Sequence, residues 1–251
     1  AYGLVLIGTF AYTFLMFVWF SLPAYLTTII EELGLTGTEA GLLVGAVPLT
    51  YIPIALFSGL IVDRIGPGRS LAIGVFIYGL AQIGRSAAPG FPSLLVLTIA
   101  LGVGATAITF GLPKLVSVLF PPDETGLPSS IYLVGSSLGS ALVFGVGRPI
   151  VGPALGGWRS LFLWSGLVAV GYGLVWYAVA WQTGIDRSVS DSDAEFSLDS
   201  IRDDLRLVLS HRELQLVVVI GTMFLLLQHG LQGWLPTLIE ARGLSANRAG
   251  Q

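Results

Sequence analysis

The stretch GLIVDRIGPGR, from Gly59 to Arg69, places an Asp-Arg pair and a turn rich in glycine between two long apolar runs. Charged side chains are costly in hydrocarbon, so such a turn between two such runs indicates a short loop held at a membrane face. A run needs about 20 apolar residues to cross a bilayer as a helix, and both flanking runs reach that length. The stretch therefore predicts an all-α, polytopic membrane protein.

The composition of the whole chain agrees with a membrane environment. The chain is 54% hydrophobic and only 11% charged, with a mean hydropathy of +0.83, whereas a soluble domain is roughly a quarter charged. Charged or Gly/Pro-rich breaks divide the apolar sequence into seven runs that we expect to span the membrane. These runs are approximately Tyr2 to Ile30, Ala40 to Val62, Ser70 to Ala88, Ser93 to Phe120, Leu127 to Leu155, Ser160 to Trp181 and Leu214 to Ile239.

One long polar segment separates the sixth run from the seventh, and eight of the fifteen acidic residues lie in it, between Asp186 and Glu213. We therefore expect a six-helix bundle over residues 1–181, a connector over 182–213, and the first helix of a second bundle over 214–251. The connector holds apolar residues on one helical stripe, which indicates an amphipathic helix that lies on the membrane surface or binds a partner. The stripe consists of Leu198, Ile201, Leu205 and Leu209.

The distribution of basic residues predicts the orientation of the chain. If the Asp63-Arg64 turn and the connector share one side of the membrane, that side holds six arginines and the other holds four. We therefore expect the connector to be cytoplasmic, in a multi-pass protein of a prokaryotic cell membrane.

An internal repeat relates the first and seventh runs. IEELGLTGTEAG, from Ile30 to Gly41, returns as IEARGLSANRAG 209 residues later, from Ile239 to Gly250, and a proline precedes each copy. The seventh run therefore looks like the first run of a second copy. Parallel six-helix repeats joined by a long loop form one large transporter architecture.

The turn D-R-x-G-x-x-R, the sequence GPALGG from Gly152 to Gly157, and this plan of six helices plus connector together resemble the major facilitator superfamily. The resemblance implies a secondary transporter that works by alternating access. It also implies that the chain is incomplete, and that the missing C-terminal helices of the same protein are its partner.

The resemblance further implies a gating motif in the turn between the second and third runs. There Asp63 and Arg64 are expected to form a charge relay that latches the cytoplasmic gate; alternatively, Asp63 caps a helix and the arginines are positive-inside anchors. Gly68 departs from the family pattern, in which a basic residue is common at this place. The motif consists of Gly59, Asp63, Arg64, Gly66 and Arg69.

The fifth run resembles a glycine-proline pattern that is common in this family. Its glycines are expected to permit close helix crossing and its prolines to kink the span; the residues are Gly139, Gly152, Pro153, Gly156 and Gly157. Arg148 lies within this run, where an arginine facing lipid would be costly. It is our leading candidate for binding an anionic group, and the alternative is a snorkelling or internally paired side chain.

Five further residues are candidates for lining the solute pathway. Lys114, the only lysine, either snorkels to the membrane face or lines a cavity beside Thr106. His229 carries a coupling proton, contacts solute, or hydrogen-bonds a neighbouring helix. Tyr12 and Trp19 share a helix face, either as an aromatic wall of the pathway or as simple packing.

The sequence also limits the classes of function. There is no cysteine and there are only two histidines, so no conventional metal site is expected. No P-loop and no catalytic set stand out, so we expect no enzyme, no cofactor, and an ion or proton gradient as the energy source. The stretches PKLVSVLFPPDE and HGLQGWLP look like the branch of cyanate and nitroimidazole permeases.

We therefore expect a small solute, either an anion or a polar organic molecule, as the transported substrate. The expected partners are this solute and the lipid bilayer, with no nucleic acid. The alternative is a seven-helix receptor or sensor without transport, although the seventh run lacks the lysine that a retinal protein needs.

Overall fold

The computed structural model describes residues 1–186, 206–207 and 209–243, except the side chains of residues 55 and 56. The regular elements within these ranges are helical. They are α1 (Tyr2–Ala24), α2 (Leu26–Leu33), α3 (Gly37–Ile65), α4 (Pro67–Ser86), α5 (Phe91–Leu119), η1 (Pro122–Glu124), α6 (Gly126–Leu142), η2 (Val143–Val151), α7 (Gly152–Leu155), α8 (Trp158–Thr183) and α10 (Arg212–Ala241). Most of the predicted connector, including the stripe from Leu198 to Leu205, lies outside the described residues.

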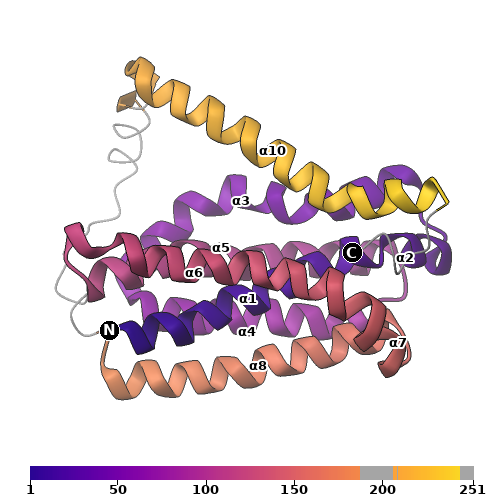
Figure 1. Cartoon of the computed structure of the whole chain (residues 1–251), viewed down its shortest axis with the longest axis horizontal. Coiled ribbons are helices and arrows are strands. Elements are labelled where there is room, and N and C mark those ends of the chain that lie inside the picture. Colours follow the sequence, from indigo (N-terminus) through magenta and orange to yellow (C-terminus); the bar gives the residue numbers. More distant parts are fainter. Residues whose placement is uncertain (187–205, 208, 244–251) are drawn as a thin grey trace.

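The long helices other than α10 lie side by side with α4 at the centre of the packing, whereas α10 slants away from them (Figure 1). α4 packs against α5 on one side and against α8 on the other, α3 packs against α5, and α1 packs against α6. The buried core consists mainly of side chains of α1, α4 and α5. The outward surfaces of α6 and α8 remain apolar and exposed, as helices that face lipid require.

Six helical segments within the described ranges are long and apolar enough to span a membrane. They include the predicted runs with the exception of the third, which corresponds to α4. α4 is less apolar than predicted for a span because it carries Arg69, Gln82 and Arg85. Gln82 and Arg85 are nevertheless buried, since α4 is covered by neighbouring helices rather than by lipid.

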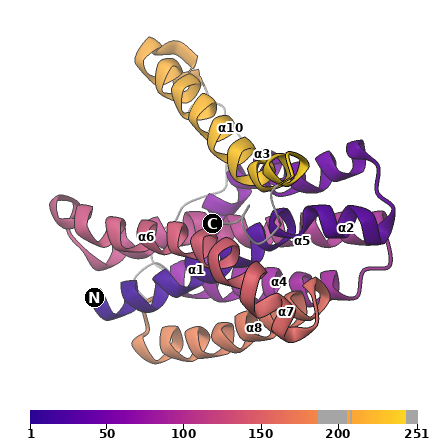
Figure 2. The same ribbon diagram turned by 45° about the vertical axis from the view of Figure 1, so that its right-hand side comes forward.

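The bundle has two ends that differ in what they contain. The connector end holds the turn from α3 to α4, the segment from α5 to α6, and the C-terminal end of α8 together with Ile185 and Asp186, which follow it. The opposite end holds α2, α7 and the end of α10 (Figure 2). These names are kept below.

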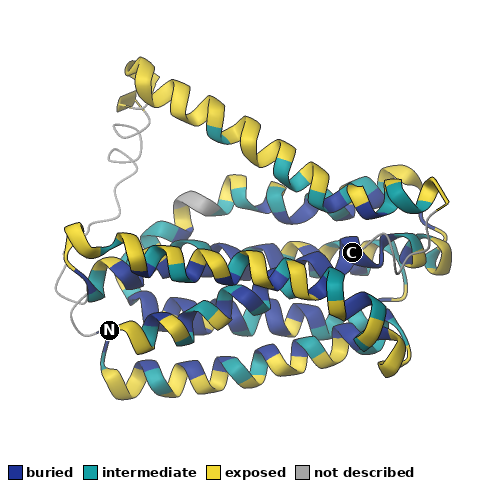
Figure 3. Ribbon diagram, viewed as in Figure 1, coloured by how far each residue is buried: buried dark blue, intermediate teal, exposed yellow. Residues whose placement is uncertain are grey.

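α10 contacts the rest of the bundle only towards the opposite end, among the described residues. From Arg212 to Leu227 every residue except Gly221 is exposed (Figure 3). Gly233 and Pro236 are buried, and Gly233 lies against Val44 of α3.

The internal repeat is visible in the backbone. α2 ends at Leu33 and is followed by Gly34, which has φ of 63°, and the segment after α10 contains Gly243, with φ of 91°. These glycines occupy the same position of the two sequence copies. A left-handed residue after a helix favours glycine, so the repeat encodes the same helix end twice.

Candidate functional site

At the connector end, Asp63 forms an ion pair with Lys114, not with Arg64. Asp63 lies in the last turn of α3, and its Oδ1 is 2.7 Å from Nζ of Lys114 in α5. Both side chains are partly exposed, and Arg64 is exposed. The contact ties the end of α3 to α5, and it places Lys114 at the gate motif rather than in the middle of the bundle.

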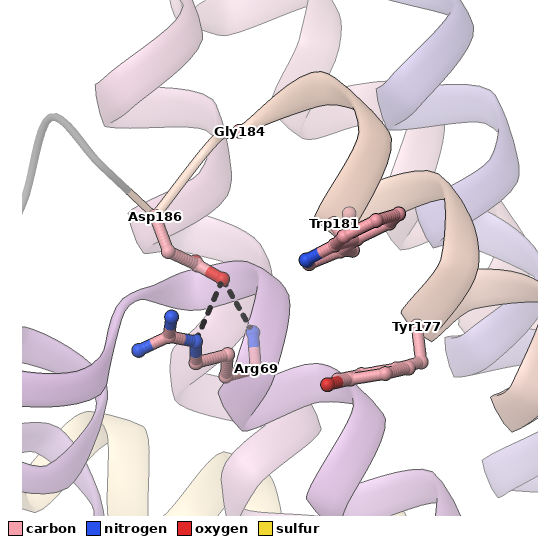
Figure 4. A pocket seen from close by; sticks show the side chains of 6 residues that line it. Arg69, Tyr177, Trp181, Gly184 and Asp186 are labelled. Atoms are coloured by element: carbon pink, nitrogen blue, oxygen red, sulfur yellow. Dashed lines mark hydrogen bonds and ion pairs between the residues drawn. The ribbon is translucent and has the colours of Figure 1, made fainter.

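Asp186 binds the first turn of α4, within the same motif. Its carboxylate accepts hydrogen bonds from the backbone N–H groups of Gly68 (2.7 Å) and Arg69 (3.1 Å), and the guanidinium of Arg69 lies 3.9 Å away (Figure 4). The first N–H groups of a helix lack partners within the helix and attract negative charge. Burial nevertheless raises the pKa of the Asp186 carboxyl, because desolvation outweighs these hydrogen bonds.

Two glycines make room for this carboxylate. Gly66 has φ of 89°, a conformation that favours glycine, and a Cβ there would collide with the Asp186 side chain. A Cβ on Gly68 would lie 2.8 Å from Ile185 and 2.9 Å from Asp186. Gly68, the departure from the family pattern, is therefore the residue that lets the end of α8 rest on α4.

A pocket of about 240 Å³ lies beside this contact. Its lining includes Arg69, Tyr177, Trp181 and Asp186, so it lies where the end of α8 meets the first turns of α4 (Figure 4). A Cβ on Gly59 would meet nothing within 4 Å among the described residues.

Near the middle of the bundle, side chains from five helices form a polar aromatic group that we call the central cluster. The Trp19 ring lies 5.9 Å from the Tyr51 ring and 5.3 Å from the His229 ring, between ring centres. The Tyr12 ring lies 6.3 Å from the Tyr132 ring. The central cluster consists of Tyr12, Trp19, Tyr51, Tyr132 and His229, from α1, α3, α6 and α10, together with Thr109 of α5.

Hydroxyl groups of the central cluster lie within hydrogen-bonding distance of one another. Tyr51 and Thr109 share a hydrogen bond of 2.8 Å, and Tyr12 lies beside Thr109 and Ser136. Nδ1 of His229 is 3.0 Å from the carbonyl oxygen of Leu225, one turn earlier in α10. Thr106 is not part of the cluster, since it is fully buried and bonded to Ser58 at 2.6 Å.

Arg148 lies at the opposite end, in a buried network that crosses from the first six helices to α10. Its guanidinium forms an ion pair with Glu240 in the last turn of α10, and it also donates to Thr27 of α2 at 3.4 Å. Thr27 donates in turn to the second Glu240 oxygen at 2.6 Å. The Tyr25 hydroxyl donates to the Arg148 carbonyl at 3.1 Å.

The backbone around Arg148 is a π-helix, η2, instead of an α-helix. Pro149 lacks an N–H and disturbs the α-helical pattern, and single π-helical turns are frequent at functional sites. Gly139 and Gly152 sit at close approaches, the first to the Thr13 backbone and the second to the Tyr25 hydroxyl. Pro153 lies in the first turn of α7, and Gly156 and Gly157 form the turn into α8 with φ of 93° and 121°.

A second group of charged side chains lies at this end, and all of its members belong to the first six helices. Glu32 of α2 accepts hydrogen bonds from Trp158 (2.6 Å) and Arg159 (2.8 Å) at the start of α8, which lower the pKa of its carboxyl. Arg159 also donates to the carbonyl oxygens of Ser86 and Ala88, each at 3.0 Å. No group of three or more metal-ligating side chains occurs in the described ranges.

Sequence reasoning found Arg148, His229, Tyr12 and Trp19 but missed their partners. Glu240 is part of the repeat and corresponds to Glu31, which gave a signal for its position but none for its contact with Arg148. Tyr51 and Tyr132 lie in apolar runs where an isolated tyrosine carries no signal. The sequence marks Asp186 only as the first acidic residue of the connector.

A model of the protein family described as Major Facilitator Superfamily matches residues 6–251. The chain is 30% identical over 152 residues to the protein named "Probable L-galactonate transporter" of Escherichia coli (strain K12), covering 60% of this chain and 33% of that protein. It is 28% identical to the hexuronate transporter of Bacillus subtilis (strain 168), covering 60% and 34%. It is 24% identical to a nitrate/nitrite transporter of Picosynechococcus, covering 67% and 36%. The chain thus matches about a third of the length of these relatives.

Two solved structures share the fold. A bacterial homologue of the human lysosomal transporter Spinster, in an inward-facing and occupied conformation, superposes with a TM-score of 0.66 at 20% identity, covering 98% of this chain and 56% of that one. A D-xylose-proton symporter superposes with a TM-score of 0.67 at 17% identity, covering 99% and 63%.

Proposed function

Because the chain belongs to the Major Facilitator Superfamily, we propose that it is part of a secondary active transporter that moves a small anion across the cell membrane by alternating access. The relatives named above are transporters of galactonate, hexuronate, and nitrate or nitrite by their names, and all of these solutes are anions. The energy source is an ion or solute gradient, and the connector lies in the cytoplasm.

One observation carries this proposal. The contacts between α10 and the preceding helices are confined to the last part of α10, from His229 to Glu240, in the described part of the chain. At the connector end, the ionic contacts of Asp63 and Asp186 stay within the first six helices. The helix α10, the first of the proposed second bundle, thus contacts the first bundle at one end only, and such one-sided contact is expected of one state in an alternating-access cycle.

The central cluster is the proposed path of the solute. It supplies hydroxyl groups and aromatic rings contributed by α10 and by four helices of the first bundle. Such groups bind hydroxyl-bearing organic anions by hydrogen bonding and packing. The cluster contains no fixed positive charge, so the charge of an anion has to be met elsewhere, and Arg148 is the buried arginine that lies against α10.

The test is uptake of a panel of labelled anions by cells that produce the protein as its gene encodes it, with and without a proton gradient. Uptake of at least one anion above the level of cells lacking the protein is expected. No uptake or exchange of any anion, by a protein shown to be in the membrane, would contradict the proposal.

Asp63→Asn tests the gate within the same assay. This change removes the ion pair with Lys114 at the connector end, and uptake should fall on the order of tenfold, because the ends of α3 and α5 lose their charge contact. Asp123→Asn, at an exposed residue of η1 near the same end, is the matched control and should transport normally. Normal uptake by the Asp63 variant would remove the gating role.

A further inference from the structure

The cluster of Arg148, Glu240, Thr27 and Tyr25 joins three separate parts of the chain. Arg148 comes from η2, Thr27 and Tyr25 from the break between α1 and α2, and Glu240 from the last turn of α10. The side chains of Arg148 and Glu240 are only 5% and 12% exposed. Among the described residues, the ion pair of Arg148 with Glu240 is the only ion pair between α10 and the preceding helices.

We propose that this cluster is a latch operated by the transported anion. The carboxylate, sulfonate or similar group of the solute replaces the Glu240 carboxylate on Arg148, and this exchange releases α10 and opens the opposite end. The inference rests on the proposed transport function and assigns the residue that meets the charge of the solute.

The chemistry of Arg148 supports an exchange of one anion for another. A buried guanidinium stays protonated and is strongly destabilising when its partner is removed, so Glu240 can leave only when another anion takes its place. A solute carboxylate offers the same pair of oxygens as Glu240, in the geometry that a guanidinium binds best. The latch is therefore selective for anions.

Charge balance explains why the exchange moves α10. If Glu240 and a solute anion both stayed beside Arg148, two negative charges would share one positive charge in a place that water scarcely reaches. Arg148 is fixed in the bundle by η2, whereas Glu240 lies one residue before α10 ends. Of the two negative groups and Arg148, Glu240 can move into water with the least change in the first bundle. Because it lies in the last turn of α10, the end of α10 moves with it.

The other described cations of this end, Arg85, Arg159 and Arg242, form no ion pair with α10, and Arg242 is exposed just after that helix. Arg159 is held by Glu32 and by two carbonyl oxygens. Arg85 is fully buried within α4 and lies 4.8 Å over the Phe162 ring. Arg148 is therefore the cation whose partner lies on α10.

The latch is tested by the access of a thiol reagent from the opposite side of the membrane. The natural-length protein, freed of any cysteine, receives one cysteine by Ser136→Cys beside the central cluster, and a membrane-impermeant reagent is added on that side. In the absence of solute, Glu240→Gln should raise the labelling rate on the order of tenfold. Glu213→Gln, at the exposed start of α10, is the matched control and should leave the rate unchanged.

Two further variants separate a latch from a folding defect. Glu240→Asp keeps the carboxylate and should label slowly. The swap Arg148→Glu with Glu240→Arg should restore slow labelling but abolish the response to anion, because the cation then lies on α10. If the swap protein does not reach the membrane, Glu240→Asp and Glu240→Gln still decide the question.

The anion itself supplies the last comparison. The labelled anion that the unaltered protein takes up best should accelerate labelling from the opposite side several-fold, and Arg148→Gln should abolish this acceleration. An anion that is transported but leaves the labelling rate unchanged, or a Glu240→Gln protein that labels no faster than its parent, would overturn the latch while leaving transport intact. Absence of all anion transport would instead contradict the proposed function.

Discussion

The ionic contacts at the two ends of this bundle join different sets of helices. At the connector end, Asp63 with Lys114 and Asp186 with the first turn of α4 join helices of the first bundle to one another. At the opposite end, Arg148 with Glu240 joins that bundle to α10. The connector-end contacts hold helices of the first bundle together, whereas the opposite-end contact joins that bundle to α10, and in the proposed latch it is the contact that the anion breaks.

The close packing of helices also differs between the two ends. α8 rests on α4 at the connector end because Gly66 and Gly68 leave space for Asp186. α10 lies close to α3 at Gly233, where an added Cβ would be 2.8 Å from Val44, nearer the opposite end. A substitution at the connector end should therefore disturb the fold of the first bundle, and one at the opposite end should disturb its relation to α10.

The largest effect is expected from Gly68→Val at the connector end. The added side chain would displace Ile185 and Asp186 from α4, and overpacking of this kind costs typically about 1–3 kcal/mol. Thermal unfolding in detergent should detect the loss as a lower Tm. Gly59→Val is the control, since its Cβ meets nothing within 4 Å among the described residues, and equal effects of both changes would contradict the packing account.

Arg85→Met should have an effect of opposite sign. The three guanidinium nitrogens of Arg85 have no hydrogen-bond partner in the described part of the chain, and the residue is fully buried. Replacing a buried charge by an apolar side chain of similar size is often neutral or stabilising by about 1–4 kcal/mol. The Tm should stay equal or rise, whereas Arg148→Met should loosen α10. A marked fall in Tm for Arg85→Met would show that this arginine has a stabilising partner.

Asp186→Ala should cost about 1 kcal/mol, the usual effect of removing a side chain that accepts from the first N–H groups of a helix. Trp176 still holds this turn, since its Nε1 donates to the Gly68 carbonyl at 2.9 Å. The effect on Tm should therefore be smaller than that of Gly68→Val. A larger effect would mean that Asp186, rather than packing, determines the position of α8.

The smallest effect on Tm is expected from Glu32→Gln, and this effect should depend on pH. Trp158 and Arg159 lower the pKa of the Glu32 carboxyl in the folded protein, so its contribution to stability is present above the ordinary carboxyl pKa and is lost as pH falls through the lowered value. Because the side chain is 43% exposed, the contribution is at most a few tenths of a kcal/mol. Glu32→Gln should lower Tm slightly at pH 7, and this effect should shrink as pH falls below the ordinary carboxyl pKa. A shift in Tm that does not change with pH would contradict the ionic contribution.

The sequence was sufficient to predict the fold and the family. Apolar runs, the D-R-x-G turn and the repeat predicted an all-α major facilitator protein, and this prediction is confirmed. The branch of cyanate and nitroimidazole permeases, the division into domains and the roles of the site residues stay predictions. The predicted third span, α4, is less apolar than expected because it carries Arg69, Gln82 and Arg85. Gln82 and Arg85 are buried in a helix that α5 and α8 cover, and no pattern along the chain reports such shielding.

Long-range contacts were harder to predict than the elements that carry them. Arg148 was recognisable as an arginine in an apolar run, but its partner Glu240 is 92 residues away in sequence, and only the packing of α10 brings them together. Asp63 and Lys114 were both recognised, yet α3 and α5 had to be placed side by side before their pairing could be seen. The sequence marks Gly68 only as an exception to the family motif, because its role in packing depends on where α8 ends.

The central claim is that the two ends open alternately, and paired spin-label distances test it most directly. The described chain contains no cysteine, so one pair can be placed at Leu127 and Leu216 on the connector end and another at Glu31 and Arg242 on the opposite end. On adding the transported anion, the account predicts a shorter distance at the connector end and a longer one at the opposite end. Distances that stay fixed, or that change in the same direction at both ends while uptake continues, would contradict it.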